Sequence, residues 1–263
     1  MRLVTWNINS VRQRLHLIEQ LTKDYAPDVI CLQEIKAQNK DFPLAEIEAM
    51  GYTHNEVRGM KGYNGVAILS RVPLENGQSR DWVGKDDSRH VFATLPGGIE
   101  VHNFYVPAGG DVPDRDQNDK FGHKLDFVDE MKAWFPEMYS NDRPMILVGD
   151  LNIAPMEHDV WSHKKLLKIV SHTPIEVEKL NDAQNAFGWV DTMRHFVPDE
   201  EKLYSWWSYR ARDWRAANKG RRLDHIWATP VLTPRLKHME VIVDARGWEK
   251  PSDHAPVLLD LED

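Results

Sequence analysis

Acidic and amide side chains follow several apolar segments of this chain at short, regular spacing. The stretch LVGDLNIAP, residues 147–155, runs from apolar residues into Asp150, and Asn152 follows two positions later. Alternate side chains of a strand point to the same face, so both would project from one side of a strand end. Other expected strand ends carry residues of the same polar kinds: Asn7, Asn9, Glu34, Tyr105, Asp224, Asp253 and His254. A single Asp or Asn at such a place often only forms a turn, but a set gathered at one end of a sheet would be a site.

The combination of carboxylates, amides, a phenol and an imidazole predicts metal-assisted phosphoryl transfer. Glu34 and Asp253 offer hard oxygen ligands, which suit Mg²⁺ better than zinc. A carboxylate can deprotonate water, and the other groups can donate to a developing oxyanion, each worth roughly a hundredfold or more in rate. The sequence contains no glycine-rich phosphate loop and no GxSxG serine turn, so we expect hydrolysis by water rather than a covalent route.

Strands must position these side chains, and the apolar patterns predict many strands and few helices. We expect strands at 2–8, 27–33, 65–70, 91–95, 99–106, 144–148, 223–229, 236–243 and 255–261. We expect helices at 11–24 with Ser10 as N-cap, at 42–52, at 118–138 and at 175–186. The rest of 155–222 reads as loose and polar. Because crossover helices separate only some of the strands, mixed sheets with helices outside fit better than one doubly wound parallel sheet.

Bulk properties narrow the class of protein. The 263 residues are 41% hydrophobic and show no repeat or linker, which predicts a single domain over 1–263. No apolar run reaches membrane-spanning length and the first residues lack a continuous apolar signal region, so we expect a cytoplasmic protein without a membrane partner. One cysteine, Cys31, excludes an internal disulfide and a cysteine-rich zinc site.

The charge is unevenly distributed along the chain. The net charge is -8, which is not typical of a nucleic-acid binder. The segment 202–222, KLYSWWSYRARDWRAANKGRR, is nevertheless basic and rich in aromatic residues. Such side chains neutralise phosphates and stack on bases. A solvated basic loop with a few core aromatics is the alternative explanation.

Seven ordered stretches resemble the motifs of one known family. They are WNINSVR, PDVICLQEIK, GYNGVAILS, YVPAGG, LVGDLNIAP, GRRLDHIW and PSDHAPV, and they span residues 4–257. Together they resemble the exonuclease III branch, the abasic-site endonucleases, of the endonuclease/exonuclease/phosphatase superfamily. The resemblance implies an α/β (α+β) fold of the DNase I-like type, a four-layer sandwich of two mixed β-sheets flanked by helices. It also implies a Mg²⁺-dependent DNA repair nuclease that cleaves 5′ to abasic sites and degrades duplex DNA from 3′ ends. In such enzymes 3′-phosphatase or phosphodiesterase activity often accompanies these.

The resemblance assigns a metal and a nucleophile. Glu34 matches the principal metal carboxylate, with Asp253 at or near the same ion, which is Mg²⁺ with Mn²⁺ as the alternative. Asp150 matches the residue that deprotonates the attacking water, and Asn152 the amide that contacts the phosphate. Asn7 matches the amide that orients the catalytic Asp and can reach metal. Asp150 and Asn152 could bind a second ion, so the mapping leaves one or two metals open.

Three further matches concern charge in the transition state. Tyr105 matches a phenol that stabilises this charge. Asp224 matches the partner that fixes the tautomer of His254, and His254 matches the imidazolium that contacts a phosphate oxygen.

The pocket for the substrate departs from the family pattern. Ala108 stands where relatives often carry an Asn or Gln that holds the phosphate, a contact that Asn64 or Arg89 could take over. Arg221 stands where the mammalian-type enzyme has an aromatic pocket wall. The rest of this wall is matched by Trp206, Trp207 and Leu223.

Two other functions compete with that of a DNA repair nuclease. The first is a phosphatase or phosphodiesterase of the same superfamily that acts on an inositol lipid or sphingolipid. The second is a non-catalytic DNA or protein binder, which would have no need of the whole polar set. The expected partner is double-stranded DNA with abasic sites or 3′ ends, bound by a monomer.

Overall fold

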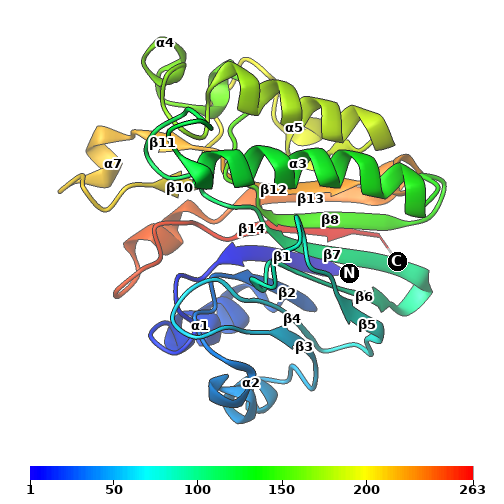
Figure 1. Ribbon diagram of the computed structural model, residues 1–263. Helices are drawn as coiled ribbons and strands as arrows, with labels where there is room; N and C mark the ends of the chain where they lie inside the picture. The colour runs from blue at the N-terminus through cyan, green and yellow to red at the C-terminus, as the bar shows by residue number, and fades with distance from the viewer. Residues whose placement is uncertain (263) are drawn as a thin grey trace.

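A computed structural model describes residues 1–262 as two β-sheets that pack face to face, with helices on both outer sides (Figure 1). Sheet 1 has the strand order β13-β14-β1-β2-β4-β3 and sheet 2 the order β5-β6-β7-β8-β12-β9. The strands of sheet 1 are β1 (Arg2–Asn7), β2 (Val29–Gln33), β3 (His54–Arg58), β4 (Val66–Ser70), β13 (Leu236–Val241) and β14 (Val257–Leu261). The strands of sheet 2 are β5 (Glu75–Ser79), β6 (His90–Leu95), β7 (Ile99–Tyr105), β8 (Met145–Asp150), β9 (Val190–Asp191) and β12 (Asp224–Ala228).

A short ribbon and the helices complete the chain. The ribbon pairs β10 (Trp206–Trp207) with β11 (Gly220–Arg221). The α-helices are α1 (Leu15–Tyr25), α2 (Leu44–Ala49), α3 (Asp119–Met138), α4 (His163–Leu166), α5 (Pro174–Phe187), α6 (Thr192–Phe196) and α7 (Trp214–Ala217). The 3₁₀ helices are η1 (Asn39–Asp41), η2 (Pro96–Gly98), η3 (Glu157–Asp159), η4 (Pro230–Arg235) and η5 (Val243–Gly247).

Strand alternation separates three apolar cores. On β1, Leu3 joins the core between the two sheets, whereas Val4 faces α1 and α2. On β8, Val148 joins the same central core and Leu147 packs beneath α3 and α5. Side chains of opposite parity therefore stabilise opposite faces of each sheet, and the layers run helix, sheet, sheet, helix. The predicted four-layer sandwich of two mixed sheets is confirmed.

Strand register brings the polar strand ends to one rim. β1 and β2 are parallel, and β7 and β8 are parallel with Tyr105 opposite Asp150. β12 is antiparallel to β8, with Asp224 opposite Asp150. Asp224 therefore begins its strand rather than ending one, yet it lies at the same rim. The polar residues come from two facing sheets and not from the end of a single sheet.

The first helix begins later than the sequence predicted. α1 starts at Leu15, and Ser10 has a φ of 87°, so it does not cap a helix. The backbone N–H groups of Ser10 and Val11 donate to the carbonyl oxygens of Glu34 (2.8 Å) and Ile35 (3.1 Å). Residues 10 and 11 thus continue beside the segment that follows β2, and this pairing outweighs the local helix signal.

Two edge strands and several short elements were missing from the prediction. β3 is only half-buried and all five residues of β5 are exposed, so neither shows an apolar alternation. The region 155–222 was expected to hold one helix, α5. It also contains α4, α6, α7 and the two-residue strands β9, β10 and β11, which are too short to leave a periodic pattern.

Among residues 1–262, none of the helices combines the length and apolarity needed to cross a membrane. Cys31 is a buried free thiol of the central core, as the sequence indicated. The single domain over 1–263 stays a prediction.

Candidate active site

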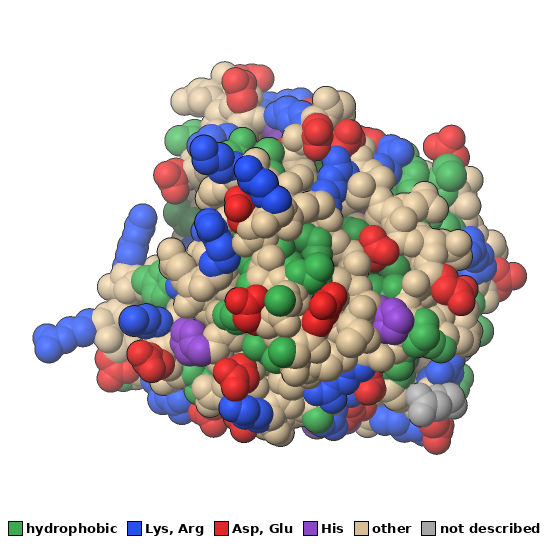
Figure 2. Space-filling view, turned by 90° about the horizontal axis from the view of Figure 1, so that it is seen from below, with side chains coloured by type: hydrophobic (Ala, Val, Ile, Leu, Met, Phe, Trp, Pro, Cys, Tyr) green, Lys and Arg blue, Asp and Glu red, His purple; other side chains and the backbone are tan. Residues whose placement is uncertain are grey.

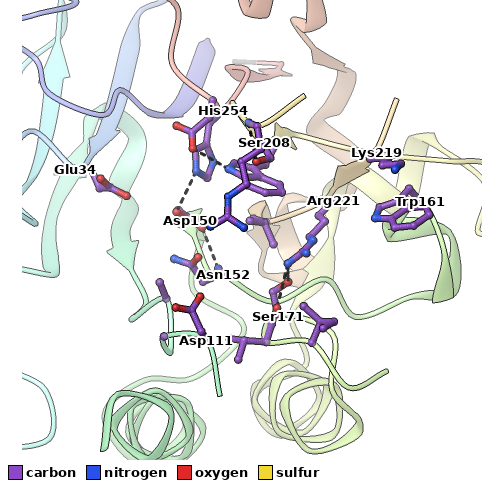
Figure 3. A pocket seen from close by; sticks show the side chains of 18 of the residues that line it. Glu34, Asp111, Asp150, Asn152, Trp161, Ser171, Ser208, Lys219, Arg221 and His254 are labelled. Carbon is purple, nitrogen blue, oxygen red and sulfur yellow. Dashed lines mark hydrogen bonds and ion pairs between the residues drawn. The ribbon is translucent and has the colours of Figure 1, made fainter. Parts of the chain in front are cut away.

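The rim of the two sheets and the β10–β11 ribbon enclose a cleft of about 540 Å³. Figure 3 shows this cleft, with Glu34 on one side, Arg221 on the other and Asp150 between them. The predicted site residues that line it are Glu34, Tyr105, Asp150, Asn152, Asp253, His254, Trp206, Arg221 and Leu223. Segments that are up to 220 residues apart, from 34 to 254, therefore share one cavity.

A buried, hydrogen-bonded group of Asp224, His254 and Asp150 lies at the centre of the cleft. Nδ1 of His254 lies 2.8 Å from Oδ2 of Asp224, and Nε2 lies 3.7 Å from Oδ2 of Asp150. Ser205 Oγ donates to the same Asp224 oxygen (2.6 Å) and accepts the backbone N–H groups of Leu223 and Asp224. The Asp224 carboxylate thereby fixes the ring of His254, with Nε2 turned to the cleft.

Burial and neighbouring charges shift the pKa values of His254 and Asp150. Burial alone would lower the pKa of His254, but the carboxylates of Asp224 and Asp150 outweigh it, and the pKa is raised above its ordinary value. Burial raises the pKa of Asp150, and the nearby charge of His254 opposes this only in part. A carboxylate with a raised pKa, such as that of Asp150, is suited to accept a proton. The imidazolium of His254 beside it is suited to donate a hydrogen bond.

Asn7 links the two sheets behind the cleft. Its Nδ2 donates to Oε1 of Glu34 (3.0 Å) and to Oδ2 of Asp150 (2.9 Å). Its Oδ1 accepts the backbone N–H of Asn9. Asn7 is fully buried and does not line the cleft, and its amide links the two carboxylates; a contact of Asn7 with metal stays a prediction.

Glu34 is held on both of its oxygens. Oε1 accepts the hydroxyl of Tyr105 (2.7 Å), and Oε2 lies 2.8 Å from Nζ of Lys36. Burial would raise the pKa of Glu34, but the charge of Lys36 and the hydrogen bonds from Asn7 and Tyr105 lower it. Glu34 is therefore an anion at neutral pH.

Burial and the charges of Glu34 and Asp150 have the opposite effect on the phenol, because they raise the pKa of Tyr105 well above its ordinary value. Tyr105 consequently keeps its proton and acts as a hydrogen-bond donor. Its ring is held from behind by Arg89, whose guanidinium lies 5.0 Å from the ring centroid.

Asp253 precedes β14 of sheet 1 and lines the same cleft as Glu34. Its Oδ1 accepts Nδ2 of Asn9 (3.1 Å), and its Oδ2 accepts the indole N–H of Trp206 (2.9 Å). Oδ1 of Asn9 also accepts Nζ of Lys36 (2.6 Å), so a chain of contacts connects Asp253 to Glu34. The ammonium of Lys36 neutralises Glu34 in this structure.

Backbone geometry aims Asn152. The residue has a φ of 55°, a left-handed conformation that Asn tolerates better than most residues. Its backbone N–H donates to Oδ1 of Asp150 (3.0 Å), and its side-chain amide donates to the carbonyl of Val106 (2.9 Å). Lys124 supports the turn from below by donating to the Asn152 carbonyl (2.7 Å), and Glu176 pairs with this buried ammonium.

A metal ion could be held here. One ligand atom from each of Asp150, Asp224 and His254 lies within 4.8 Å of the others. Glu34 and Asp253 also offer carboxylate oxygens to the cleft, and these are harder ligands than the imidazole nitrogen of His254.

Three predicted substrate-binding residues do not line the cleft. Trp207 is buried against Tyr204 and Trp214, beside the cleft, because neighbours on β10 point to opposite sides. The side-chain amide of Asn64 donates to the carbonyl of Asp87 (2.9 Å), and Arg89 pairs with the Asp87 carboxylate. In this structure Asn64 and Arg89 are joined through Asp87, and Arg89 lies against the ring of Tyr105; a phosphate contact of either residue stays a prediction.

Sequence reasoning missed several residues of the site. Lys36 follows Glu34 by two positions, a spacing that could have indicated the ion pair. Ser205 and Lys124 gave no local signal, because each acts on a segment far away in the chain.

Positive charge is concentrated on residues 208–219, which border the cleft, although the net charge of the chain is -8. Arg210, Arg212, Arg215 and Lys219 are all exposed there, and Arg210 and Lys219 also line the cleft. In Figure 2, basic side chains project at the left of the molecule, the side on which α7 lies in Figure 1. Residues 208–219 of the basic segment are therefore largely exposed next to the cleft, whereas Tyr204, Trp207 and Arg222 are buried.

Comparison with known proteins agrees with this geometry. The model of the Endonuclease/Exonuclease/phosphatase family matches residues 4–254. Exodeoxyribonuclease III of Haemophilus influenzae is 31% identical and the alignment covers 98% of both chains. An AP endonuclease from Archaeoglobus fulgidus has a TM-score of 0.93 at 32% identity, and a 3′ phosphatase from Neisseria bound to a product DNA hairpin has a TM-score of 0.91 at 30% identity. Both solved structures are covered in full and cover all of this chain. The chain therefore belongs to the endonuclease/exonuclease/phosphatase family, in its exodeoxyribonuclease III branch.

Proposed function

We propose that this chain is a Mg²⁺-dependent DNA repair nuclease that hydrolyses phosphodiesters with an activated water. It nicks duplex DNA 5′ to abasic sites, degrades it from 3′ ends and removes 3′-phosphate groups. The observation that carries the proposal is the meeting of Glu34, Asp150 and the Asp224–His254 pair in one cleft. The names of three relatives, an exodeoxyribonuclease III, an AP endonuclease and a 3′ phosphatase bound to DNA, support the substrate.

Glu34 and Asp253 are the proposed ligands of the ion. Their carboxylate oxygens fit Mg²⁺, with Mn²⁺ as a substitute, since both are hard cations. When bound, the ion stabilises negative charge on the phosphate and on the leaving oxygen. Lys36 would have to give up its contact with Glu34 Oε2 or share that oxygen.

Asp150 is the proposed general base. It takes a proton from the water that attacks phosphorus, and Asn7 holds its carboxylate at the required angle. Asn152, fixed by its bond to Val106, uses its remaining amide hydrogen to hold a phosphate oxygen.

His254 and Tyr105 are the proposed donors to the transition state. The imidazolium of His254 donates from Nε2 to a phosphate oxygen, and Asp224 keeps the ring in place. The protonated Tyr105 hydroxyl donates on the opposite side of the cleft. Trp206 and Leu223 form the wall for the sugar that follows the scissile phosphate.

A duplex that carries one tetrahydrofuran abasic analogue tests the proposal. We expect nicking 5′ to the analogue with Mg²⁺ and none with EDTA. The matched control is the same duplex without the analogue, labelled at a 3′ end to follow exonuclease digestion. Activity on an inositol or sphingolipid phosphate without activity on DNA would contradict the proposal, and so would binding of DNA without any hydrolysis.

The cellular and assembly state follow from the same proposal. A cytoplasmic monomer acting on double-stranded DNA is the simplest form of such an enzyme, and the single domain over 1–263 is sufficient for it. Sedimentation at micromolar concentration checks the monomer.

A further inference from the structure

The side chain of Arg221 carries its charge into the wall of the cleft. Nη1 donates to the carbonyl of Val170 (3.1 Å) and to Oγ of Ser171 (2.8 Å), which are both neutral oxygens. The guanidinium lies 5.3 Å from the ring centroid of Trp206. Figure 3 shows Arg221 reaching along the cleft to Ser171. The charge therefore faces the substrate space instead of a carboxylate.

The neighbouring arginine shows what a structural arginine looks like in this molecule. Arg222 donates to Asp191 (2.6 Å) and Asp159 (2.8 Å), and these carboxylates raise its pKa although burial alone would lower it. Burial lowers the pKa of Arg221, and the more distant charge of Glu176 offsets this only in part. Within the described chain, Nε is buried without a hydrogen-bond partner in both arginines, so they differ in the charge of the groups that their terminal nitrogens contact.

A desolvated guanidinium without a contacting anion costs free energy that a structural role would not require. Two hydrogen bonds to neutral oxygens could equally be made by an uncharged amide. Phosphate and carboxylate groups match the planar fork of a guanidinium. The cleft thus offers a place for an anion beside the scissile phosphate.

Possible substrates differ in the group that is attached to the scissile phosphate. At an internal abasic site the group beyond the scissile phosphate is a neutral deoxyribose. At a blocked 3′ end it is either an additional oxygen of a phosphomonoester, with its extra negative charge, or the carboxylate of a sugar remnant. Directly next to the scissile phosphate, only the blocked ends carry an anion, because the next phosphate of an internal abasic strand lies one sugar further along.

We propose that Arg221 is a specificity residue that selects DNA whose 3′ end carries an anionic block over DNA with an internal abasic sugar. This inference rests on the proposed function and names its preferred substrate class. The reaction is the same hydrolysis: water forms a new bond to phosphorus, the bond from phosphorus to O3′ breaks, and O3′ leaves with a proton. The products are a 3′-hydroxyl and either inorganic phosphate or phosphoglycolate.

The test compares three duplexes of one sequence: a nick with a 3′-phosphate, a nick with a 3′-phosphoglycolate, and an internal tetrahydrofuran. For Arg221→Gln, which keeps a donor for Val170 or Ser171, we expect kcat/KM on both blocked ends to fall about 30-fold. On the tetrahydrofuran duplex we expect a change of less than about threefold. Product inhibition by inorganic phosphate should weaken in parallel, and Arg221→Lys should restore part of the loss.

Two control variants separate the possible causes. Lys219→Met removes an exposed charge from the same cleft and should affect all three duplexes alike, because it contributes only general attraction for phosphates. Ser171→Ala removes a contact of Arg221 without removing its charge, and should leave the preference for blocked ends in place.

An equal loss on all three duplexes in Arg221→Gln would show a structural clamp and overturn the inference, and so would no loss on any of them. A selective loss on only one blocked end would identify that anion as the one selected. If the wild-type protein cleaves none of the duplexes while retaining its fold by circular dichroism, the proposed function itself fails and the inference fails with it.

Discussion

Two clusters of buried charge lie close together in the chain and are built in opposite ways. In the first, Arg222 and Arg194 face the carboxylates of Asp159 and Asp191, so that positive and negative charges match. In the second, Asp150 and Asp224 share the single imidazole of His254.

The pKa values reflect this difference. Burial would raise the pKa of Asp159, but the two arginines outweigh it and the pKa is lowered. The pKa of Asp150 is raised. A matched cluster holds loops together, whereas a cluster with excess negative charge costs stability and is found where a bound cation supplies the missing positive charge. The comparison therefore predicts that equivalent Asp→Asn changes have opposite effects in the two clusters.

The largest effect is expected for Asp150→Asn. Without a general base, kcat on abasic duplex DNA should fall by about 10³-fold or more. DNA binding should change by less than about threefold, and the free energy of unfolding should stay the same or rise by about 1 kcal/mol, because the buried carboxylate is no longer strained. Single-turnover kinetics, a binding titration and urea unfolding measure the three quantities. Turnover close to wild type would refute the base, and weak binding would indicate a structural role.

The converse is expected for Asp159→Asn, the matched control in the structural cluster. It leaves Arg222 and Arg194 without a full counter-charge, which should lower the free energy of unfolding by about 3 kcal/mol. The kcat of the folded variant should remain within about twofold of wild type, since Asp159 does not line the cleft. Urea unfolding beside a rate assay tests this. A variant that lost activity but not stability would contradict the division of the two clusters.

The contribution of the Asp159 carboxylate to the free energy of unfolding should depend on pH. The pKa of Asp159 is lower in the folded than in the unfolded state, so its contribution is complete above the unfolded value, about 3.9. The contribution is lost as the pH falls through the lowered folded value. The stability difference between wild type and Asp159→Asn should therefore shrink steadily below about pH 4. Urea midpoints at several pH values between neutral and acid check the trend, which a pH-independent difference would rule out.

The smallest effect concerns Ala108. Its side chain is exposed at the cleft, and its carbonyl accepts Nζ of Lys124 (3.3 Å), so the backbone there is fixed. Ala108→Asn would add an amide that can hold a phosphate, and we expect about fivefold tighter binding of abasic DNA. Undamaged duplex is the control. An unchanged dissociation constant would exclude this contact.

The sequence predicted those parts of the molecule in which one segment carries its own signal. Apolar strands such as β8 end in polar residues, so Asp150 and Asn152 could be proposed from their spacing together with the polar residues at the other expected strand ends. The sequence could not show which of Trp206 and Trp207 lines the cleft. Neighbours on a strand face opposite sides, and the two-residue strands β10 and β11 are too short for an apolar alternation that would mark the cleft side. Ser205 and Lys124 owe their roles to the packing of distant segments, and nothing in their own neighbourhood predicts it.

The polar edge strands that escaped prediction also bear on how copies of this chain meet. β5 forms one border of sheet 2, all five of its residues are exposed, and its pairing with β6 is irregular between Glu75 and Gln78. A polar, irregular border is a poor template for a strand from another molecule. This border therefore disfavours pairing between the sheets of two copies at high protein concentration. The cleft carries the polar groups that can bind a partner.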